Sequence, residues 1–100
     1  MKLKTSPALD SKILSLVNQE RKYQDTKWGI QEHDPHKWMS IITEEVGEAA
    51  EAILKGDYDN ACVEFIQIAA VAVAIAGAIE EHCKEVLEKI NAESDNNTDE

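Results

Sequence analysis

The sequence predicts an all-α fold, in which three to four helices form a four-helix-bundle-like structure that oligomerisation completes. Apolar residues recur at helical spacing from Leu9 to Tyr23. Proline directly follows a capping residue at Ser6-Pro7 and at Asp34-Pro35, a pairing typical of helix starts. The segment from Ala61 to Ile79 is apolar around its whole circumference, so other helices must cover every side of it.

The first helix is predicted to begin at Pro7, with Ser6 as its cap, and to run to about Lys27. A loop follows from Trp28-Gly29 and closes at Asp34. It separates the first helix from an acidic second one.

The second helix is predicted from Pro35 to about Lys55, where Gly56 can adopt the left-handed conformation that often ends a helix. The third follows, and three residues are candidates for its cap: Asp57, Asp59 and Asn60. Two further helices of a 100-residue chain can hardly cover this apolar third helix. We therefore expect a homodimer or homotetramer.

The C-terminal part of the chain is amphipathic from Glu80 to Ala92 and then polar. This stretch either continues the third helix or forms a fourth, because the sequence has no clear break that decides between them. Residues 94–100 are predicted to be a disordered acidic tail, which leaves 6–93 as a single domain.

The charge balance excludes several classes of partner. Twenty acidic residues against ten basic ones give a net charge of −10, which disfavours binding to nucleic acids or anionic membranes. The N-terminal residues have no apolar run of a signal peptide, so we expect a cytoplasmic protein. The longest uncharged apolar run, Ile68 to Ile79, has twelve residues, whereas a membrane-spanning helix needs about 20.

The acidic residues of the second helix suggest a cation site. Glu44, Glu45, Glu48 and Glu51 fall within about a third of the helix circumference, and like charges so spaced destabilise a helix. The third helix carries Glu64 along an apolar face, where an unpaired carboxylate is costly. A shared Mg²⁺ resolves both problems, and because Mg²⁺ often completes its shell with phosphate oxygens, it predicts a phosphate-bearing substrate.

The motif Glu44-Glu45-x-x-Glu48, followed by Glu64-x-x-Gln67, resembles the MazG-like all-α nucleoside triphosphate pyrophosphohydrolases, in particular a phage-type branch. Their signature is Glu-Glu-x-x-Glu, a spacer and Glu-x-x-Asp. The resemblance spans roughly residues 18–80 and has these further matching stretches: Glu20-Arg21-Lys22 with Gln24, Lys27-Trp28-Gly29, His33-Asp34, Trp38 and Thr43 to Glu48.

The resemblance implies hydrolysis of a nucleoside triphosphate between the α and β phosphates, with Mg²⁺, or alternatively Mn²⁺, as cofactor. Glu44 is then the expected catalytic carboxylate, although Glu44 and Glu45 could exchange roles if the helix is rotated slightly. The expected metal ligands are Glu45, Glu48, Glu64 and Gln67. A pocket for the base is expected around the loop. The expected substrate-binding residues are Trp28, His33, Lys37 and Trp38.

Gln67 departs from the signature, which has Asp there, and its neutral amide predicts weaker Mg²⁺ binding rather than none. It also favours a rival interpretation, a nonhydrolytic helical module that binds a nucleotide or a protein partner. A plain dimerisation bundle with a solvated acidic face is a third possibility, but it leaves Glu64 unexplained.

Overall fold

The computed structural model describes the backbone of residues 1–98 and the side chains of all of these except 81–83, 85 and 95–98. A short 3₁₀ turn, η1 (Pro7–Leu9), precedes four α-helices. Their bounds are α1 Asp10–Trp28, α2 Pro35–Leu54, α3 Tyr58–Ala78 and α4 Glu80–Thr98. Residues 1–98 contain no β-strand, so the all-α prediction is confirmed.

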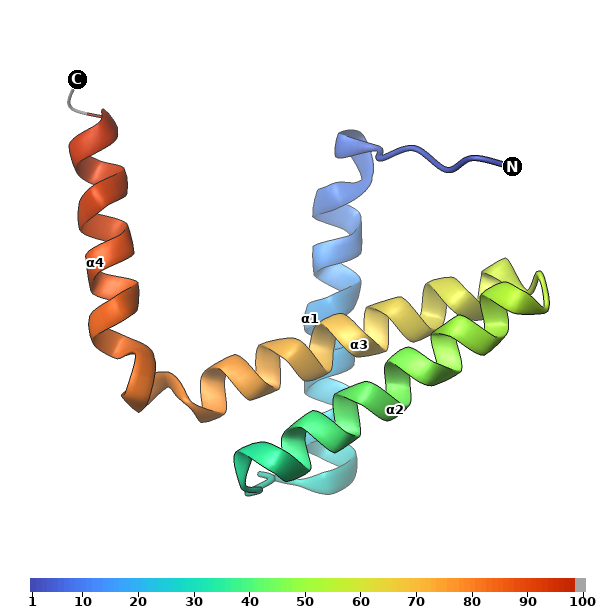
Figure 1. Ribbon diagram of the computed structural model, residues 1–100, viewed down its shortest axis with the longest axis horizontal. Helices are drawn as coiled ribbons and strands as arrows, with labels where there is room; N and C mark the ends of the chain where they lie inside the picture. The colour runs from blue at the N-terminus through green and yellow to red at the C-terminus, as the bar shows by residue number, and fades with distance from the viewer. Residues whose placement is uncertain (99–100) are drawn as a thin grey trace.

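Helix α3 is the centre of the arrangement, because both α1 and α2 pack against it. The tight connection at Gly56 turns the chain back, so α2 and α3 run alongside each other as a helical hairpin (Figure 1). Helix α1 crosses α3 on the far side in this view, while α4 turns away from the end of α3 and stands apart from α1 and α2 (Figure 1).

The starts of α2 and α3 follow from their capping residues. The Asp34 side chain accepts hydrogen bonds from the backbone N–H groups of His36 and Lys37, at 2.8 and 3.1 Å. The Asp57 side chain accepts one from the N–H of Asn60 at 3.2 Å, which selects Asp57 among the three candidate caps. Gly56, with φ +73°, adopts the left-handed conformation predicted for the turn between these helices.

The predicted start of the first helix is only partly correct. Ser6 makes no capping hydrogen bond through its side chain, and Pro7 opens a 3₁₀ turn rather than the α-helix itself. The α-helical part starts at Asp10 and extends to Trp28, one residue beyond the predicted end.

Replacing Asp34 by alanine is expected to lower the free energy of unfolding by about 1 kcal/mol, because two N–H groups of the first turn of α2 lose their acceptor. Ser6→Ala is the matched control and should have almost no effect, since the Ser6 side chain caps nothing. Urea unfolding followed by circular dichroism measures both changes. Equal effects of the two substitutions would contradict this assignment of the caps.

The structure decides the open question of a third or a fourth helix. Helix α3 ends at Ala78, Ile79 leaves the helical conformation with φ −106° and ψ 14°, and α4 begins at Glu80. The break follows Gly77, a weak helix former, at the point where the apolar run gives way to polar residues.

The predicted boundary at Ser94 is not a helix end. Helix α4 continues through Thr98, because no glycine or proline interrupts the chain after Glu80. The predicted disordered tail thus begins inside α4, and its last two residues, 99 and 100, lie outside the described residues.

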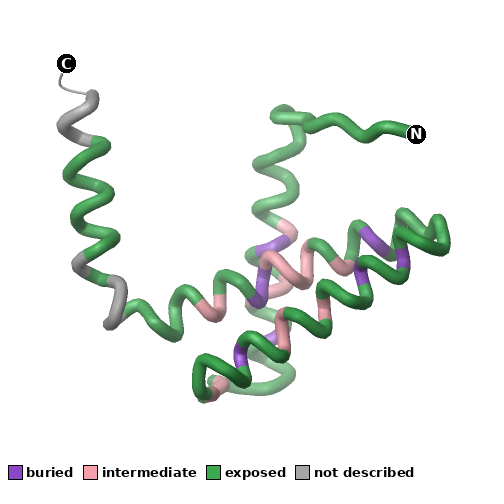
Figure 2. Tube along the Cα trace, viewed as in Figure 1, coloured by how far each residue is buried: buried purple, intermediate pink, exposed green. Residues whose placement is uncertain are grey.

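The buried core is small and lies where α1 and α2 meet α3 (Figure 2). Its apolar members are Val17, Trp38, Ala49, Ala52, Ala61, Ala70 and Val71. Several larger apolar side chains of α3 remain about half exposed, among them Val63, Phe65 and Val73. Within one chain, α1 and α2 therefore leave part of the apolar surface of α3 uncovered.

Helix α3 is also long and apolar enough to cross a membrane by length and composition alone. The whole helix counts as apolar here although it contains charged residues such as Glu64. The run of twelve residues from Ile68 to Ile79 was shorter because it contains no charged residue. Core helices of proteins without a membrane segment meet the same criterion. Helices α1 and α2 pack against α3, but only 17% of its apolar 18-residue window is buried within one chain.

Candidate metal centre and adjoining pocket

Three carboxylates from two helices converge between α2 and α3. Glu45 and Glu48 lie three residues apart on α2, and Glu64 comes from the adjacent part of α3. One carboxylate oxygen from each lies within 4.8 Å of the other two. We call these three residues the carboxylate cluster. Its members are the three glutamates that the sequence analysis predicted as metal ligands.

Two oxygens of the carboxylate cluster have no hydrogen-bonding partner although they are buried: Glu45 Oε2 and Glu64 Oε2. An unsatisfied buried oxygen costs on the order of 1–3 kcal/mol, and more when it is charged. No lysine, arginine or histidine forms an ion pair with the cluster in the described part of the chain. Hard divalent cations prefer carboxylate oxygens, so the donor set fits Mg²⁺ or Mn²⁺.

Burial and mutual repulsion shift the ionisation of the carboxylate cluster. Burial, followed by the negative charges of Glu64 and Glu48, raises the pKa of Glu45 above its usual value. Burial, followed by the charge of Glu48, also raises the pKa of Glu64. Both carboxyl groups thus hold protons more tightly in the folded chain than in the unfolded one.

The raised pKa values predict how stability depends on pH in the absence of divalent cations. The protonated carboxyl groups of Glu45 and Glu64 stabilise the folded chain. This contribution is fully present below the ordinary pKa of 4.5 and is lost as pH rises through the higher folded-state pKa values. The metal-free protein should therefore become more stable, relative to Glu45→Gln/Glu64→Gln, on acidification from pH 7 to about pH 5.

Thermal unfolding in chelator across this pH range measures the difference between the two proteins, and the comparison cancels the groups they share. If the difference in unfolding temperature between the two proteins did not change with pH, the raised pKa values of Glu45 and Glu64 would be contradicted. Added Mg²⁺ should stabilise the unmodified protein at pH 7, because a cation binds the ionised carboxylates of the folded chain.

The face that α2 turns toward the protein carries mostly small apolar residues and one of its glutamates. The buried stripe runs through Trp38, Ala49 and Ala52, with Glu45 half-buried on it. The larger apolar residues Val46 and Ile53 of the same helix are 48% and 45% exposed. The small alanines on the buried stripe allow α2 and α3 to approach closely, and this brings the glutamates of the two helices together.

A pocket with a volume of about 400 Å³ adjoins the carboxylate cluster. Its lining comes from α1, the following loop, α2 and α3: Gln24, Trp28, Gln31, His33, Trp38, Ile41, Glu45, Val71 and Ala74. We call it the aromatic pocket. Glu45 belongs both to its lining and to the carboxylate cluster, so a ligand in the pocket lies next to the acidic groups.

The aromatic pocket contains three of the four residues predicted to bind the substrate. Trp38 is buried, and the His33 ring packs edge-on against it with ring centroids 4.7 Å apart and an interplanar angle of 74°. His33 Nε2 lies 3.0 Å from Gln31 Oε1, a hydrogen bond that orients the imidazole. Trp28 is half exposed at the end of α1, with the Lys27 ammonium 4.8 Å from its ring centroid.

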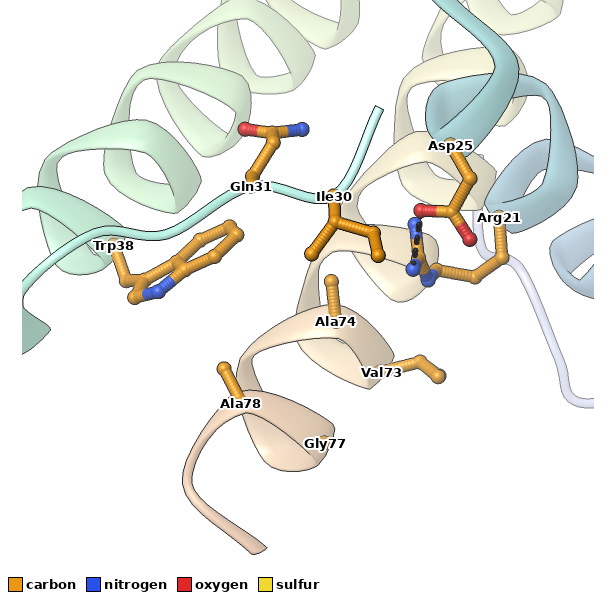
Figure 3. Close-up of a pocket in the computed structure, with 9 residues that line it drawn as sticks. All are labelled: Arg21, Asp25, Ile30, Gln31, Trp38, Val73, Ala74, Gly77 and Ala78. Atoms are coloured by element: carbon orange, nitrogen blue, oxygen red, sulfur yellow. Dashed lines mark hydrogen bonds and ion pairs between the residues drawn. The ribbon is translucent and has the colours of Figure 1, made fainter. Parts of the chain in front are cut away.

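A second pocket, of about 380 Å³, lies beside the first and shares Gln31, Trp38 and Ala74 with it. Figure 3 shows Ile30 above Ala74, between Trp38 and the Arg21–Asp25 pair. The Arg21 guanidinium donates to Asp25 at 2.8 Å, so an acid already partly neutralises its charge.

The other predicted site residues lie outside these groupings. Glu44 is exposed on α2, adjacent to Glu45. Lys37 is exposed near the start of α2, and its side chain lines none of the described pockets. Gln67 is half-buried one turn after Glu64 and lines a groove between α1 and α3.

The sequence analysis did not assign a role to Gln24, a polar residue of α1. Gln24 is only 5% exposed, lines the aromatic pocket and donates to Glu20 Oε1 at 3.5 Å. Its Oε1 accepts a bond from Arg21 at 3.3 Å. Gln24 follows the buried Val17 by two helical turns, so the periodicity of α1 already places a polar residue on its buried face.

Comparisons with protein-family models, with curated proteins and with solved structures found no match to this chain. The chain itself provides two features with chemical potential. These are a carboxylate cluster that suits a cation and an aromatic pocket that shares Glu45 with it.

Proposed function

We propose that this protein is a Mg²⁺-dependent nucleoside triphosphate pyrophosphohydrolase of the MazG-like type. One water and one nucleoside triphosphate would give a nucleoside monophosphate and pyrophosphate, with cleavage between the α and β phosphates. The observation that carries the proposal is the carboxylate cluster, with two buried oxygens lacking partners, directly beside an aromatic pocket. A triphosphate bound through its base at the pocket would extend toward the acidic groups.

Glu45, Glu48 and Glu64 are the proposed cation ligands, with Gln67 as a neutral contributor through its amide oxygen or a water. The cation would offset the phosphate charge and so let an anionic substrate approach a chain with a net charge of −10. Glu44 is solvent-accessible and next to the cluster, so its carboxylate can orient or deprotonate the attacking water.

The base is proposed to bind in the aromatic pocket. The Trp38 and Trp28 rings provide flat surfaces for stacking, and His33 and Gln24 provide polar groups. Lys37, exposed on the first turn of α2, is free to meet a phosphate of the substrate rather than the base.

We also propose that a second copy of the chain covers the exposed apolar side chains of α3 and completes the four-helix MazG-like bundle in a homodimer or homotetramer. Val63, Phe65 and Val73 are about half exposed on α3. Val86, Leu87 and Ile90 on α4 are similarly exposed. A cytoplasmic enzyme that acts on free nucleotides fits the acidic surface.

Phosphorus NMR tests the proposed reaction. Ribo- and deoxyribonucleoside triphosphates are incubated separately with the protein and Mg²⁺, and the products are identified by their resonances. Pyrophosphate and monophosphate are expected, and the fastest reaction identifies the preferred base. Orthophosphate with diphosphate would mean cleavage of a different bond. No product with either Mg²⁺ or Mn²⁺ would contradict the hydrolytic proposal.

A nonhydrolytic nucleotide-binding module is the second candidate, and Gln67 favours it because the signature has an acidic residue at that position. Calorimetric titration with the same triphosphates separates the two. Binding without any product in the NMR experiment would support the binding module, whereas turnover excludes it.

A further inference from the structure

Helix α4 leaves an apolar face uncovered within its own chain. Val86, Leu87 and Ile90 are about half exposed, and because Ile90 follows the other two by four and three residues, all three lie on one face. Among the described residues, α4 contacts only α3, and it stands clear of α1 and α2 (Figure 1). A helix in water gains most of its stability from packing an apolar face, so α4 needs a partner that the described residues of its own chain do not provide.

The N-terminal half of α1 has a second uncovered apolar stretch. The part of α1 that packs against α3 buries Val17 and Gln24. The stretch before it exposes three apolar side chains, those of Leu9, Ile13 and Leu14. Figure 1 shows this stretch extending past α3, toward the same side as α4. Helices α1 and α4 each have 19 residues, so they match in length when paired.

The charges of these two helices are opposite in sign. Residues 1–28 contain six basic and three acidic residues, a net charge of +3, whereas residues 80–98 contain two basic and six acidic residues, a net charge of −4. Residues 29–79, with two basic and nine acidic residues, have a net charge of −7. Two copies of so acidic a chain repel each other unless their contact joins oppositely charged parts. The N-terminal part with α1 is the one net-positive part of the sequence, so it is the electrostatically favoured surface for α4.

We propose that α4 of one copy docks on the N-terminal half of α1 of a second copy, and that the reciprocal contact forms as well. The two copies then clasp each other about a two-fold axis, as is usual for a dimer that uses the same surface twice. The apolar side chains that meet are Leu9, Ile13 and Leu14 of α1 and its preceding turn, and Val86, Leu87 and Ile90 of α4. This pairing rests on the homo-oligomer proposed above and does not depend on triphosphate hydrolysis.

Analytical ultracentrifugation of the full-length protein tests the pairing through one substitution on each helix. Leu14→Asp and Ile90→Asp are each expected to weaken self-association about tenfold or more, because each places an unpaired charge in both reciprocal contacts. Both residues are exposed within one chain, so the substitutions should leave the helical circular dichroism spectrum unchanged. Leu54→Asp is the matched control: Leu54 is exposed at the end of α2, outside the proposed contact, and this variant should associate like the unmodified protein.

Mixing the two aspartate variants identifies which helices meet. The Leu14→Asp copy keeps an unmodified α4 and the Ile90→Asp copy keeps an unmodified α1, so one of the two reciprocal contacts can form between them. A mixed dimer is expected that is stronger than either variant alone and weaker than the unmodified dimer. Association that withstands either substitution, or two variants that do not associate on mixing, would overturn the pairing while leaving the proposed oligomer in place. An unmodified protein that is monomeric would overturn both, and the phosphorus NMR experiment tests the proposed reaction independently of either result.

Discussion

Replacing Glu48 by glutamine is expected to lower kcat/KM for triphosphate hydrolysis by about 100-fold or more. Even groups that only support metal ligands cost about 10- to 100-fold when replaced, and Glu48 is a proposed ligand. Its carboxylate is one of three that meet within 4.8 Å. Phosphorus NMR initial rates at saturating Mg²⁺ measure the loss for the preferred nucleotide.

Glu51→Gln is the control for this substitution, because Glu51 lies one turn further along α2 and pairs with Lys55 at 2.8 Å. It should retain nearly full activity. Stability in chelator gives a second readout: Glu48→Gln should unfold at the same temperature as the unmodified protein or a higher one, since it removes charge that raises the pKa values of Glu45 and Glu64. Full activity in Glu48→Gln would contradict the proposed metal centre.

Replacing Trp38 by alanine is expected to lower the free energy of unfolding by about 3–5 kcal/mol, the range for removing a large buried aromatic side chain. Trp38 is 5% exposed, and it packs against His33. A loss of this size is a large part of the total stability of a small domain. Urea unfolding by circular dichroism measures it.

Trp28→Ala provides the matched comparison, because Trp28 lines the same pocket but is 56% exposed. Its cost should be below about 1 kcal/mol, as is usual for exposed positions. Equal costs for the two tryptophans would mean that Trp38 is not part of the core. Trp38→Phe should keep the fold while weakening nucleotide binding, because phenylalanine fills part of the volume with a smaller stacking surface.

Local chemistry explains why so much of the helical layout was predictable. A cap at Asp34 followed by proline, a left-handed Gly56 and a cap at Asp57 are properties of a few adjacent residues, and the structure has all three. Ser6 shows the limit of such signals: the residue types suit a cap, yet the side chain makes no capping bond. Neighbouring backbone geometry, which residue identity does not report, determines whether the hydroxyl reaches an N–H group.

The amino-acid sequence alone therefore determined the helical class, the ends of α2 and the acidic residues available to bind a cation, because these depend on contacts within a few residues along the chain. Only the tertiary structure decided that α3 ends before Glu80, that Glu45 lies on the buried face of α2, and that Gln24 lines the aromatic pocket. The positions of Glu45 and Gln24 depend on which helices pack together, whereas the break after α3 follows Gly77. The burial of Glu45 and Glu64, and the repulsion that raises their pKa values, arise only when α2 and α3 bring distant residues within a few ångströms.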